Sequence, residues 1–315
     1  MTRRPALGIG LVVFAAVLFI LNAGMSRVAL RHGVDPATLT TVRVTFTFLA
    51  LLVAALLFRR TALRPPRGRT LVLVVLLGLI GVAALQWAYF VAIDRLPVAM
   101  ALLLEYQAPV IVALWARLVQ GEQVRPRLWL GLALAVTGLA MATQVWRGAE
   151  LDTMGIAAGV LAAVCFACYF LIGEAGVTAI DPLRVILWSF GTAAVALNVV
   201  QPIVAFEGHL GLSVDMLGTL DGFSVPLWLV LAWSVVLGTV MPFFAELFAL
   251  SFVRATTVTM IAMLEPIGVA ALGWWWFGES LGPVAVVGCF AVVAGILIAQ
   301  SARAPHPQME PPAIT

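Results

Sequence analysis

The sequence predicts an all-α integral membrane protein of ten transmembrane helices, arranged as two inverted five-helix repeats with both termini cytoplasmic. Three observations lead to this fold class. The composition is that of a chain embedded in lipid, the apolar residues fall into ten runs of membrane-spanning length, and the second half of the chain repeats the first.

The composition excludes a soluble globular protein. Of the 315 residues, 63% are hydrophobic and 10% are charged, and the mean hydropathy is +1.09, whereas soluble domains have roughly 25% charged residues. All 18 basic residues are arginines, and they do not form the dense basic stripe that nucleic-acid binding requires. Nucleic acid is therefore not an expected partner. The three histidines are far apart in predicted loops, so we expect no metal site, and no cofactor is indicated.

Ten apolar runs are long enough to cross a hydrocarbon core of ~30 Å, which requires about 20 residues per helix. They lie at residues 6–28, 38–58, 70–93, 97–119, 127–146, 153–176, 182–206, 226–249, 255–277 and 282–300.

The two halves of the chain match each other. A shift of 157 residues superimposes Gly81 on Gly238, Pro109 on Pro266 and Glu122 on Glu279, and Asp35-Pro36 matches Asp181-Pro182 with a shift of 146. We therefore predict a first repeat at residues 1–147, a second at 148–302 and a short cytoplasmic tail at 303–315. Because each repeat has five helices, an odd number, the second is inverted in the membrane.

Arginine placement predicts the orientation, because cytoplasmic loops accumulate arginine. With the N-terminus inside, the cytoplasmic segments contain Arg3, Arg4, Arg59, Arg60, Arg64, Arg67, Arg69, Arg117, Arg125, Arg127, Arg184, Arg254 and Arg303. The opposite side contains Arg27, Arg31, Arg95 and Arg147. Both termini are therefore predicted to be cytoplasmic.

Two glutamates, Glu105 and Glu265, are predicted about midway along their spans. An acidic side chain there costs on the order of 2.5–3.5 kcal/mol, so each should face a polar cavity or a partner. They could bind a substrate ammonium or carry a proton, or they could be structural carboxyls, protonated or paired with Arg43. They are not repeat mates, since Glu105 aligns with Ala262 and Glu265 with Ala108.

The prolines near them, Pro109 and Pro266, are repeat mates. Proline removes the hydrogen bond to the carbonyl four residues earlier, so these residues predict helix kinks that free the carbonyls of Glu105 and Ala262. The freed carbonyls could accept from an ammonium group, or the prolines could simply permit a bend.

Other polar or aromatic residues in the spans are candidates to line a cavity, although each could equally make a helix–helix hydrogen bond. They are Asn22, Gln86, Tyr89, Tyr169, Trp188 and Asn198. Glu246 and Arg254 are interpreted as a possible gate or ion pair. Arg43 could meet a substrate carboxylate, extend outward or pair with an acid.

The paired glycines of the fifth and tenth runs, Gly131/Gly138 and Gly288/Gly295, indicate close helix packing as a scaffold or dimer contact. The protein could thus be a monomer or a homodimer. The cluster Trp274-Trp275-Trp276 is interpreted as an anchor at the outer membrane interface.

Inverted repeats are typical of secondary transporters, whose substrate site lies near the midplane between the copies. A Walker A motif is impossible because the chain has no lysine. Extramembrane domains and catalytic clusters are not apparent, which argues against an enzyme.

The segments "QWAYFVAIDRLPVAMALLLEYQAPVIVAL" and "MPFFAELFALSFVRATTVTMIAMLEPIGVAALGWWWFGESL" resemble the two EamA repeats of the drug/metabolite transporter superfamily. The chain looks most like its threonine/homoserine and aromatic amino-acid (YddG-type) exporters. The resemblance implies a multi-pass protein of the bacterial inner membrane that exports small metabolites, foremost amino acids, by alternating access at a central cavity. Lipophilic cations, drugs or other metabolites are the alternative cargo, and export could be proton-coupled or facilitated.

Overall fold

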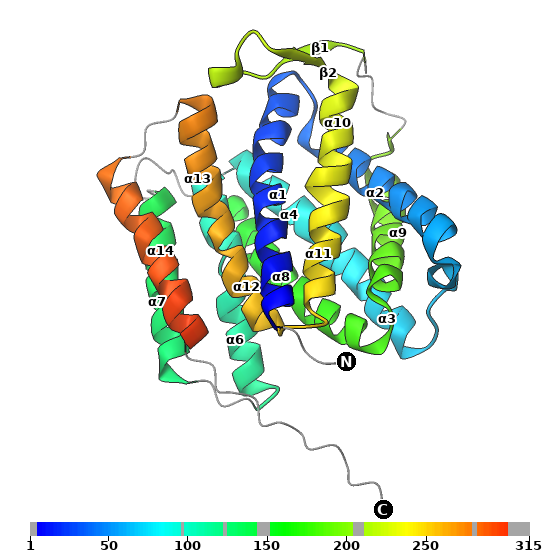
Figure 1. Ribbon diagram of the computed structural model, residues 1–315, viewed down its shortest axis with the longest axis horizontal. Helices are drawn as coiled ribbons and strands as arrows, with labels where there is room; N and C mark the ends of the chain where they lie inside the picture. The colour runs from blue at the N-terminus through cyan, green and yellow to red at the C-terminus, as the bar shows by residue number, and fades with distance from the viewer. Residues whose placement is uncertain are drawn as a thin grey trace, which may run out of the picture.

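The computed structural model describes residues 5–95, 98–121, 125–143, 152–203, 211–278 and 282–301. Glu122, Glu279, Arg3, Arg4, Arg147 and the tail at 303–315 lie outside these ranges, and so do His209 and His306. The described chain is almost entirely helical, as predicted, and its helices pack side by side in one bundle (Figure 1).

The described residues of the first half form nine helical elements. They are α1 (Pro5–Arg31), α2 (Pro36–Phe58), the 3₁₀ turn η1 (Arg60–Leu63), α3 (Arg69–Leu76), the π-helical segment η2 (Leu77–Ala84), α4 (Leu85–Arg95), α5 (Val98–Glu105), α6 (Ala108–Leu118) and α7 (Pro126–Thr143). Because α3, η2 and α4 are consecutive, they form one long helix with a π-helical middle.

The second half has the same order with a small hairpin added. It contains α8 (Thr153–Ala179), α9 (Pro182–Val200), strand β1 (Ser213–Asp215), the 3₁₀ turn η4 (Gly218–Leu220), strand β2 (Ser224–Pro226), α10 (Leu227–Val235), the π-helical segment η5 (Val236–Val240), α11 (Met241–Ala249), α12 (Ala255–Ala262), α13 (Leu264–Phe277) and α14 (Pro283–Ser301).

Within the described residues, eight of the ten predicted spans form helices long and apolar enough to cross a membrane: Pro5–Arg31, Ala37–Phe58, Arg69–Tyr89, Ala101–Leu118, Thr153–Ala179, Pro182–Val200, Leu227–Ala249 and Ala255–Phe277. The fifth and tenth predicted spans correspond to shorter apolar helices, Pro126–Ala142 and Pro283–Ala299. The described part of α7 ends next to residues 144–151, which lie outside the described ranges.

The repeated Asp-Pro pairs begin equivalent helices. Asp35 accepts a hydrogen bond from the Thr38 amide at 3.1 Å, and Asp181 accepts one from the Leu183 amide at 3.0 Å. A carboxylate at this position satisfies amides that have no partner within the helix, and the proline that follows supplies a backbone angle suited to the first turn. Both pairs therefore cap α2 and α9 in the same way.

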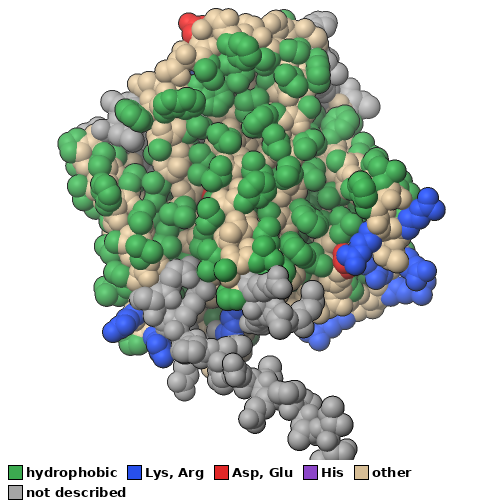
Figure 2. Space-filling model, in the orientation of Figure 1, with side chains coloured by type: hydrophobic (Ala, Val, Ile, Leu, Met, Phe, Trp, Pro, Cys, Tyr) green, Lys and Arg blue, Asp and Glu red, His purple; other side chains and the backbone are tan. Residues whose placement is uncertain are grey.

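The outer surface is apolar, as expected of a chain surrounded by lipid. Val199 is 79% exposed and Phe290 is 72% exposed, and hydrophobic side chains cover most of the visible face in Figure 2. Patches of this extent do not persist in water on a monomeric protein. The largest side chains of the interior are aromatic, with Tyr169, Phe170 and Phe190 fully buried.

The shorter helices α7 and α14 pack against each other along their length (Figure 1). A β-carbon on Gly131 would lie 2.6 Å from the carbonyl oxygen of Gly295, and one on Gly138 would lie 2.8 Å from that of Gly288. Only glycine permits backbones to approach this closely. The predicted close packing is thus confirmed within the chain, and we call this contact the glycine seam.

The hairpin β1–β2 covers one end of the bundle and was not predicted. Its strands are antiparallel with Val214 opposite Val225, and the Val214 side chain is fully buried. Trp276 is only 5% exposed, and its indole N–H donates to the Met216 carbonyl at 3.0 Å. The predicted interface role is therefore wrong for Trp276, because the hairpin supplies a hydrogen-bond partner that buries it. Trp274 and Trp275 remain more than half exposed.

The predicted span 182–206 also ends early, at Val200. Pro202 follows the helix and has no N–H to continue its hydrogen bonds, and Asn198 accepts from the Ile203 amide at 3.0 Å. Both features end α9 at Val200.

Candidate functional site

Two helix interruptions lie at equivalent positions of the two repeats. Helix α5 ends at Glu105 and α6 begins at Ala108, while α12 ends at Ala262 and α13 begins at Leu264. The 157-residue shift places Tyr106, in the first interruption, on Met263, in the second. Pro109 and Pro266 follow in the first turns of α6 and α13. A proline is tolerated there because the first amides of a helix have no partner within it.

The residues of the two interruptions meet. The Tyr106 hydroxyl donates to Glu265 Oε2 at 2.8 Å, although 159 residues separate them in the chain. Glu265 occupies the first turn of α13, where the helix dipole favours a negative group. Tyr106 is 5% exposed and Glu265 is half-buried, so this bond links the repeats in the interior.

The other acids lie near this contact. Glu105, the last residue of α5, and Glu246 of α11 are both close enough to interact electrostatically with Glu265. Glu246 is 1% exposed, and its Oε1 has no hydrogen-bond partner among the described residues. Three carboxyl groups therefore share one region of the interior, which is costly unless cations or protons balance them.

Tyrosines and one arginine extend this region. Tyr89 interacts electrostatically with Glu105, Glu265 and Arg43. Tyr169 is fully buried beside Glu246, and its hydroxyl finds no hydrogen-bond partner in the part of the chain that the structure describes. We call these residues the central polar group: Arg43, Tyr89, Glu105, Tyr106, Tyr169, Glu246 and Glu265.

The π-helical segments place backbone groups next to this region. Arg43 donates from Nε to the Thr239 hydroxyl at 3.1 Å and from Nη2 to the Gly238 carbonyl at 3.3 Å, both in η5. The Thr239 hydroxyl in turn donates to the Ser234 carbonyl at 2.7 Å. Arg43 thus binds a backbone carbonyl of the π-helical segment, where the regular α-helical hydrogen-bond pattern is locally distorted.

Each π-helical segment also carries a glycine that receives a side chain from the other repeat. Gly81 of η2 packs on Tyr169, and Gly238 of η5 packs on Asn22, where an added β-carbon would overlap the amide of Asn22. The glycines are repeat mates with a shift of 157, and Asn22 and Tyr169 are mates with a shift of 147. The two contacts are therefore copies of one contact, made once by each half.

Aromatic rings surround the central polar group. Phe243 makes edge-to-face contacts with Phe19, Tyr169 and Phe190, at centroid distances of 5.2, 5.6 and 5.3 Å. Tyr106 meets Phe166 at 5.9 Å. Such contacts favour defined ring orientations.

Four further candidates from the sequence lie outside the central polar group. The Trp188 indole donates to the Ala62 carbonyl of η1 at 3.1 Å, at the end of the bundle. Arg254 lies with Glu174 at a small pocket near the start of α12. Asn198 donates to the Thr45 hydroxyl of α2 at 2.8 Å, a helix–helix hydrogen bond. Gln86 lies in α4, and its buried Nε2 has no hydrogen-bond partner within the described ranges.

Tyr106 was not among the residues predicted from the sequence. A signal was nonetheless present, since a tyrosine beside Glu105 and three residues before Pro109 falls in the interrupted turn. The residues that the structure describes contain no group of three or more His, Cys, Asp or Glu arranged to hold a metal ion.

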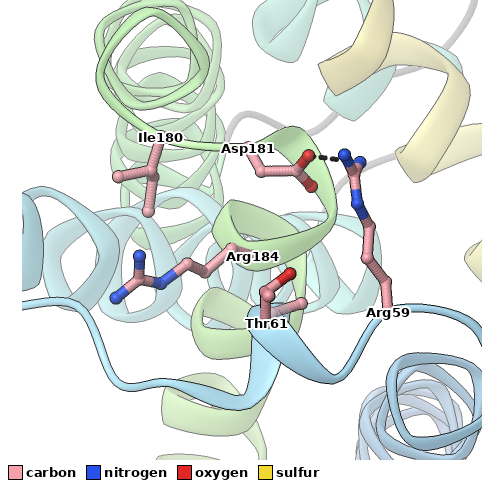
Figure 3. Close-up of a pocket in the computed structure, with 6 residues that line it drawn as sticks. Arg59, Thr61, Ile180, Asp181 and Arg184 are labelled. Carbon is pink, nitrogen blue, oxygen red and sulfur yellow. Dashed lines mark hydrogen bonds and ion pairs between the residues drawn. The ribbon is translucent and has the colours of Figure 1, made fainter.

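A pocket of about 220 Å³ lies apart from the central polar group. Arg59, Thr61, Ala62, Ile180, Asp181 and Arg184 line it (Figure 3). Arg59 and Asp181 form an ion pair across it at 2.5 Å.

A bundle of membrane-capable helices, with polar groups gathered at interrupted helices in its interior, defines a membrane transport protein. The chain belongs to the EamA-like transporter family, whose family model matches it twice, at residues 6–144 and 153–300.

Relatives named in other organisms agree with this assignment. An uncharacterized transporter of Archaeoglobus fulgidus is 30% identical over 90% of this chain and 94% of its own length. The threonine/homoserine exporter RhtA of Escherichia coli K12 is 26% identical over 68% of this chain and 66% of its own. The uncharacterized transporter YdfC of Bacillus subtilis is 24% identical over 84% of this chain and 82% of its own.

A solved structure entitled "Crystal structure of protein" superimposes with a TM-score of 0.73 at 17% identity, over 93% of this chain and 96% of that one. At this identity the likeness supports the fold alone.

Proposed function

We propose that the protein exports small metabolites, foremost amino acids, from the cytoplasm by alternating access at a site between the two repeats. The observation that carries the proposal is the contact of the two helix interruptions through Tyr106 and Glu265, beside further carboxyl groups. The similarity to RhtA, a threonine/homoserine exporter, supports amino acids as the cargo.

The chemistry of an amino acid suits this arrangement. The carboxyl groups of Glu105 and Glu265 would bind the ammonium group, together with carbonyls freed at the ends of α5 and α12. The carboxylate of the substrate would approach a helix N-terminus at α6 or α13, where the dipole is positive. Glu105 and Glu265 are not repeat mates, and such asymmetry suits a chiral substrate.

Proton coupling is the second part of the proposal. A buried carboxyl can release a proton when an ammonium group arrives and take one up when it leaves. Export of the amino acid would then be exchanged for inward movement of a proton at Glu105 or Glu265. Glu246 and Tyr169, both buried beside this site, would relay it.

We further propose the full membrane topology. The shorter helices α7 and α14 would complete ten spans in two repeats, 1–147 and 148–302, with the tail at 303–315. Helix α1 begins and α14 ends at the same end of the bundle (Figure 1), and this end carries most of the arginines on the face visible in Figure 2. By the positive-inside rule this end would face the cytoplasm of a bacterial inner membrane.

The test is counterflow in proteoliposomes with a panel of amino acids, with and without an imposed pH gradient. Saturable exchange of at least one amino acid is expected, and lipophilic cations form the comparison arm. If only the lipophilic cations were transported, they and not amino acids would be the cargo. If neither class were transported, the proposal would be refuted.

The carboxyl mechanism has its own test. Glu105→Gln and Glu265→Gln should each reduce transport at least ten-fold and abolish its response to the pH gradient. Asp221→Asn, an exposed loop residue, is the control and should transport like the parent protein. Unchanged transport and unchanged pH response in both glutamine variants would contradict the mechanism.

A further inference from the structure

The segment that joins α2 to α3 concentrates positive charge at one end of the bundle. It contains Arg59, Arg60, Arg64, Arg67 and Arg69, all exposed. Arg184 of α9 lies against the same segment, and arginine side chains gather at this end in Figure 2. Among the described residues, the acid that pairs with this cluster is Asp181, so one carboxylate stands against six arginines there.

The backbone of this segment is held in place by the second repeat. Arg184 donates to the carbonyls of Arg64 and Pro65 at 2.7 and 2.9 Å, and Trp188 donates to that of Ala62 at 3.1 Å. The arginines of the α2–α3 segment therefore project from a fixed scaffold rather than from a free loop. A fixed scaffold lowers the entropy lost when a ligand binds.

The pocket beside this scaffold has room for an anionic group. Its volume is about 220 Å³, that of roughly seven water molecules at ~30 Å³ each. Arg59 and Arg184 lie on opposite sides of Thr61 in Figure 3. A guanidinium has five N–H donors, and the contacts above use one donor of Arg59 and two of Arg184. Donors therefore remain for phosphate oxygens.

The helix turn next to the pocket is strongly apolar and exposed. Leu57 and Phe58 are 72% and 84% exposed, and Leu56 is 46% exposed. These side chains directly precede Arg59 in the sequence, so a lipid-facing surface adjoins the cationic pocket. A ligand that fits both must have an anionic head and hydrocarbon tails.

We propose that this pocket binds the headgroup of an acidic phospholipid, such as phosphatidylglycerol or cardiolipin. The phosphate accepts hydrogen bonds from Arg59 and Arg184, which favour bidentate contacts with phosphate. Arg60, Arg64 and Arg67 add electrostatic attraction, and the acyl chains lie along Leu57 and Phe58. Basic pockets between membrane helices bind acidic headgroups in this manner. The site is separate from the central polar group and does not depend on the proposed cargo.

The test measures lipid retention by native mass spectrometry of the full chain, with phosphatidylglycerol, cardiolipin and phosphatidylcholine in competition. The triple variant Arg60→Gln/Arg64→Gln/Arg67→Gln should lose affinity for the acidic lipids by about five-fold for each arginine removed. The matched control is Arg117→Gln/Arg125→Gln/Arg127→Gln, which removes three exposed arginines at the end of α6 and the start of α7. It should retain the acidic lipids.

A second variant separates lipid binding from simple structural pairing. Asp181→Asn removes the acid but keeps a side chain that caps α9 well, so it should strengthen retention of acidic lipids. Weaker retention would contradict the proposal. Equal losses of acidic-lipid retention in the two triple variants would show general attraction to the charged surface and contradict a specific site. Full displacement of the bound lipid by soluble glycerol phosphate would show an anion site that needs no acyl chains.

Discussion

Tyr106 donates a hydrogen bond to Glu265 from the other half of the chain, so the two helix interruptions are joined by a side chain rather than merely being neighbours. The repeat mate of Tyr106 is Met263, which cannot donate such a bond. The bond therefore exists once, and it makes the two halves of the interior chemically different.

The variant Tyr106→Phe removes this donor and keeps the ring against Phe166. A hydrogen bond to a charged group contributes about 1.5–3 kcal/mol, so we expect KM for counterflow to rise about ten-fold or more. Met263→Leu is the control and should have a parental KM, because a swap of similar volume in a core usually costs less than about 1.5 kcal/mol. A parental KM for Tyr106→Phe would show that the bond is not used in binding.

The variant Gly238→Ala should be destabilised because its β-carbon would overlap the Asn22 side chain. Overpacking of this kind costs about 1–3 kcal/mol. Asn22→Ala removes the obstructing amide, so the double variant should recover most of the lost Tm, measured by tryptophan fluorescence in detergent. Strictly additive losses in the double-mutant cycle would exclude a direct contact.

The variant Gly295→Ala should lower Tm further than Gly238→Ala, since its β-carbon would meet backbone atoms of Gly131 and Ala135 at 2.6 Å. Backbone cannot rotate away as a side chain can. The control is Gly10→Ala in α1, where a β-carbon would meet nothing within 4 Å. Removing a helical glycine should leave Tm there unchanged or slightly higher. Similar losses of Tm for Gly295→Ala and Gly10→Ala would argue against close packing at the glycine seam.

The hairpin β1–β2 should weaken in acid. The amides of Leu217 and Gly222 donate to Asp215 at 2.6 and 2.8 Å and hold the pKa of its carboxyl below the usual range. A lowered folded pKa means that the stabilisation is present above the unfolded pKa of about 3.9 and is lost as pH falls through the folded value.

Asp215→Asn should therefore speed amide exchange in the hairpin at neutral pH, and the difference from the parent should shrink below about pH 4. Hydrogen exchange followed by mass spectrometry, corrected for the intrinsic rate at each pH, measures this. Asp152→Asn, which alters the cap of α8, is the control and should leave the hairpin unchanged. A difference that persists at low pH would contradict the role of Asp215.

Much of the fold follows from the sequence because the bilayer imposes a simple rule. Long apolar runs must be helical in lipid, where each backbone group needs a partner within its own segment. The prolines are similarly informative. Pro109 lies two residues after the first helix interruption, and Pro266 lies three residues after the second. The Asp-Pro pairs also mark helix starts that the structure contains.

The site was less predictable, because it depends on which residues meet across the repeats. Glu105 and Glu265 were recognisable by the cost of burying an acid, but nothing local indicates that Tyr106 reaches Glu265. The π-helical segments escaped prediction for a related reason. Gly81 and Gly238 appeared only as matched positions, and their contacts with Tyr169 and Asn22 come from the opposite half of the chain. Trp276 shows the same limit, since its partner Met216 lies in a hairpin with little sequence signal.

The glycine seam has a mechanical consequence. Its two close contacts are seven residues apart on each helix, which is about 10.5 Å along the axis at 1.5 Å per residue. Two rods joined at two separate points cannot pivot about either one, so α7 and α14 behave as a single stiff strut to which each half contributes one helix. The halves can then change their relative tilt only through the remaining helices, with the strut as the fixed reference.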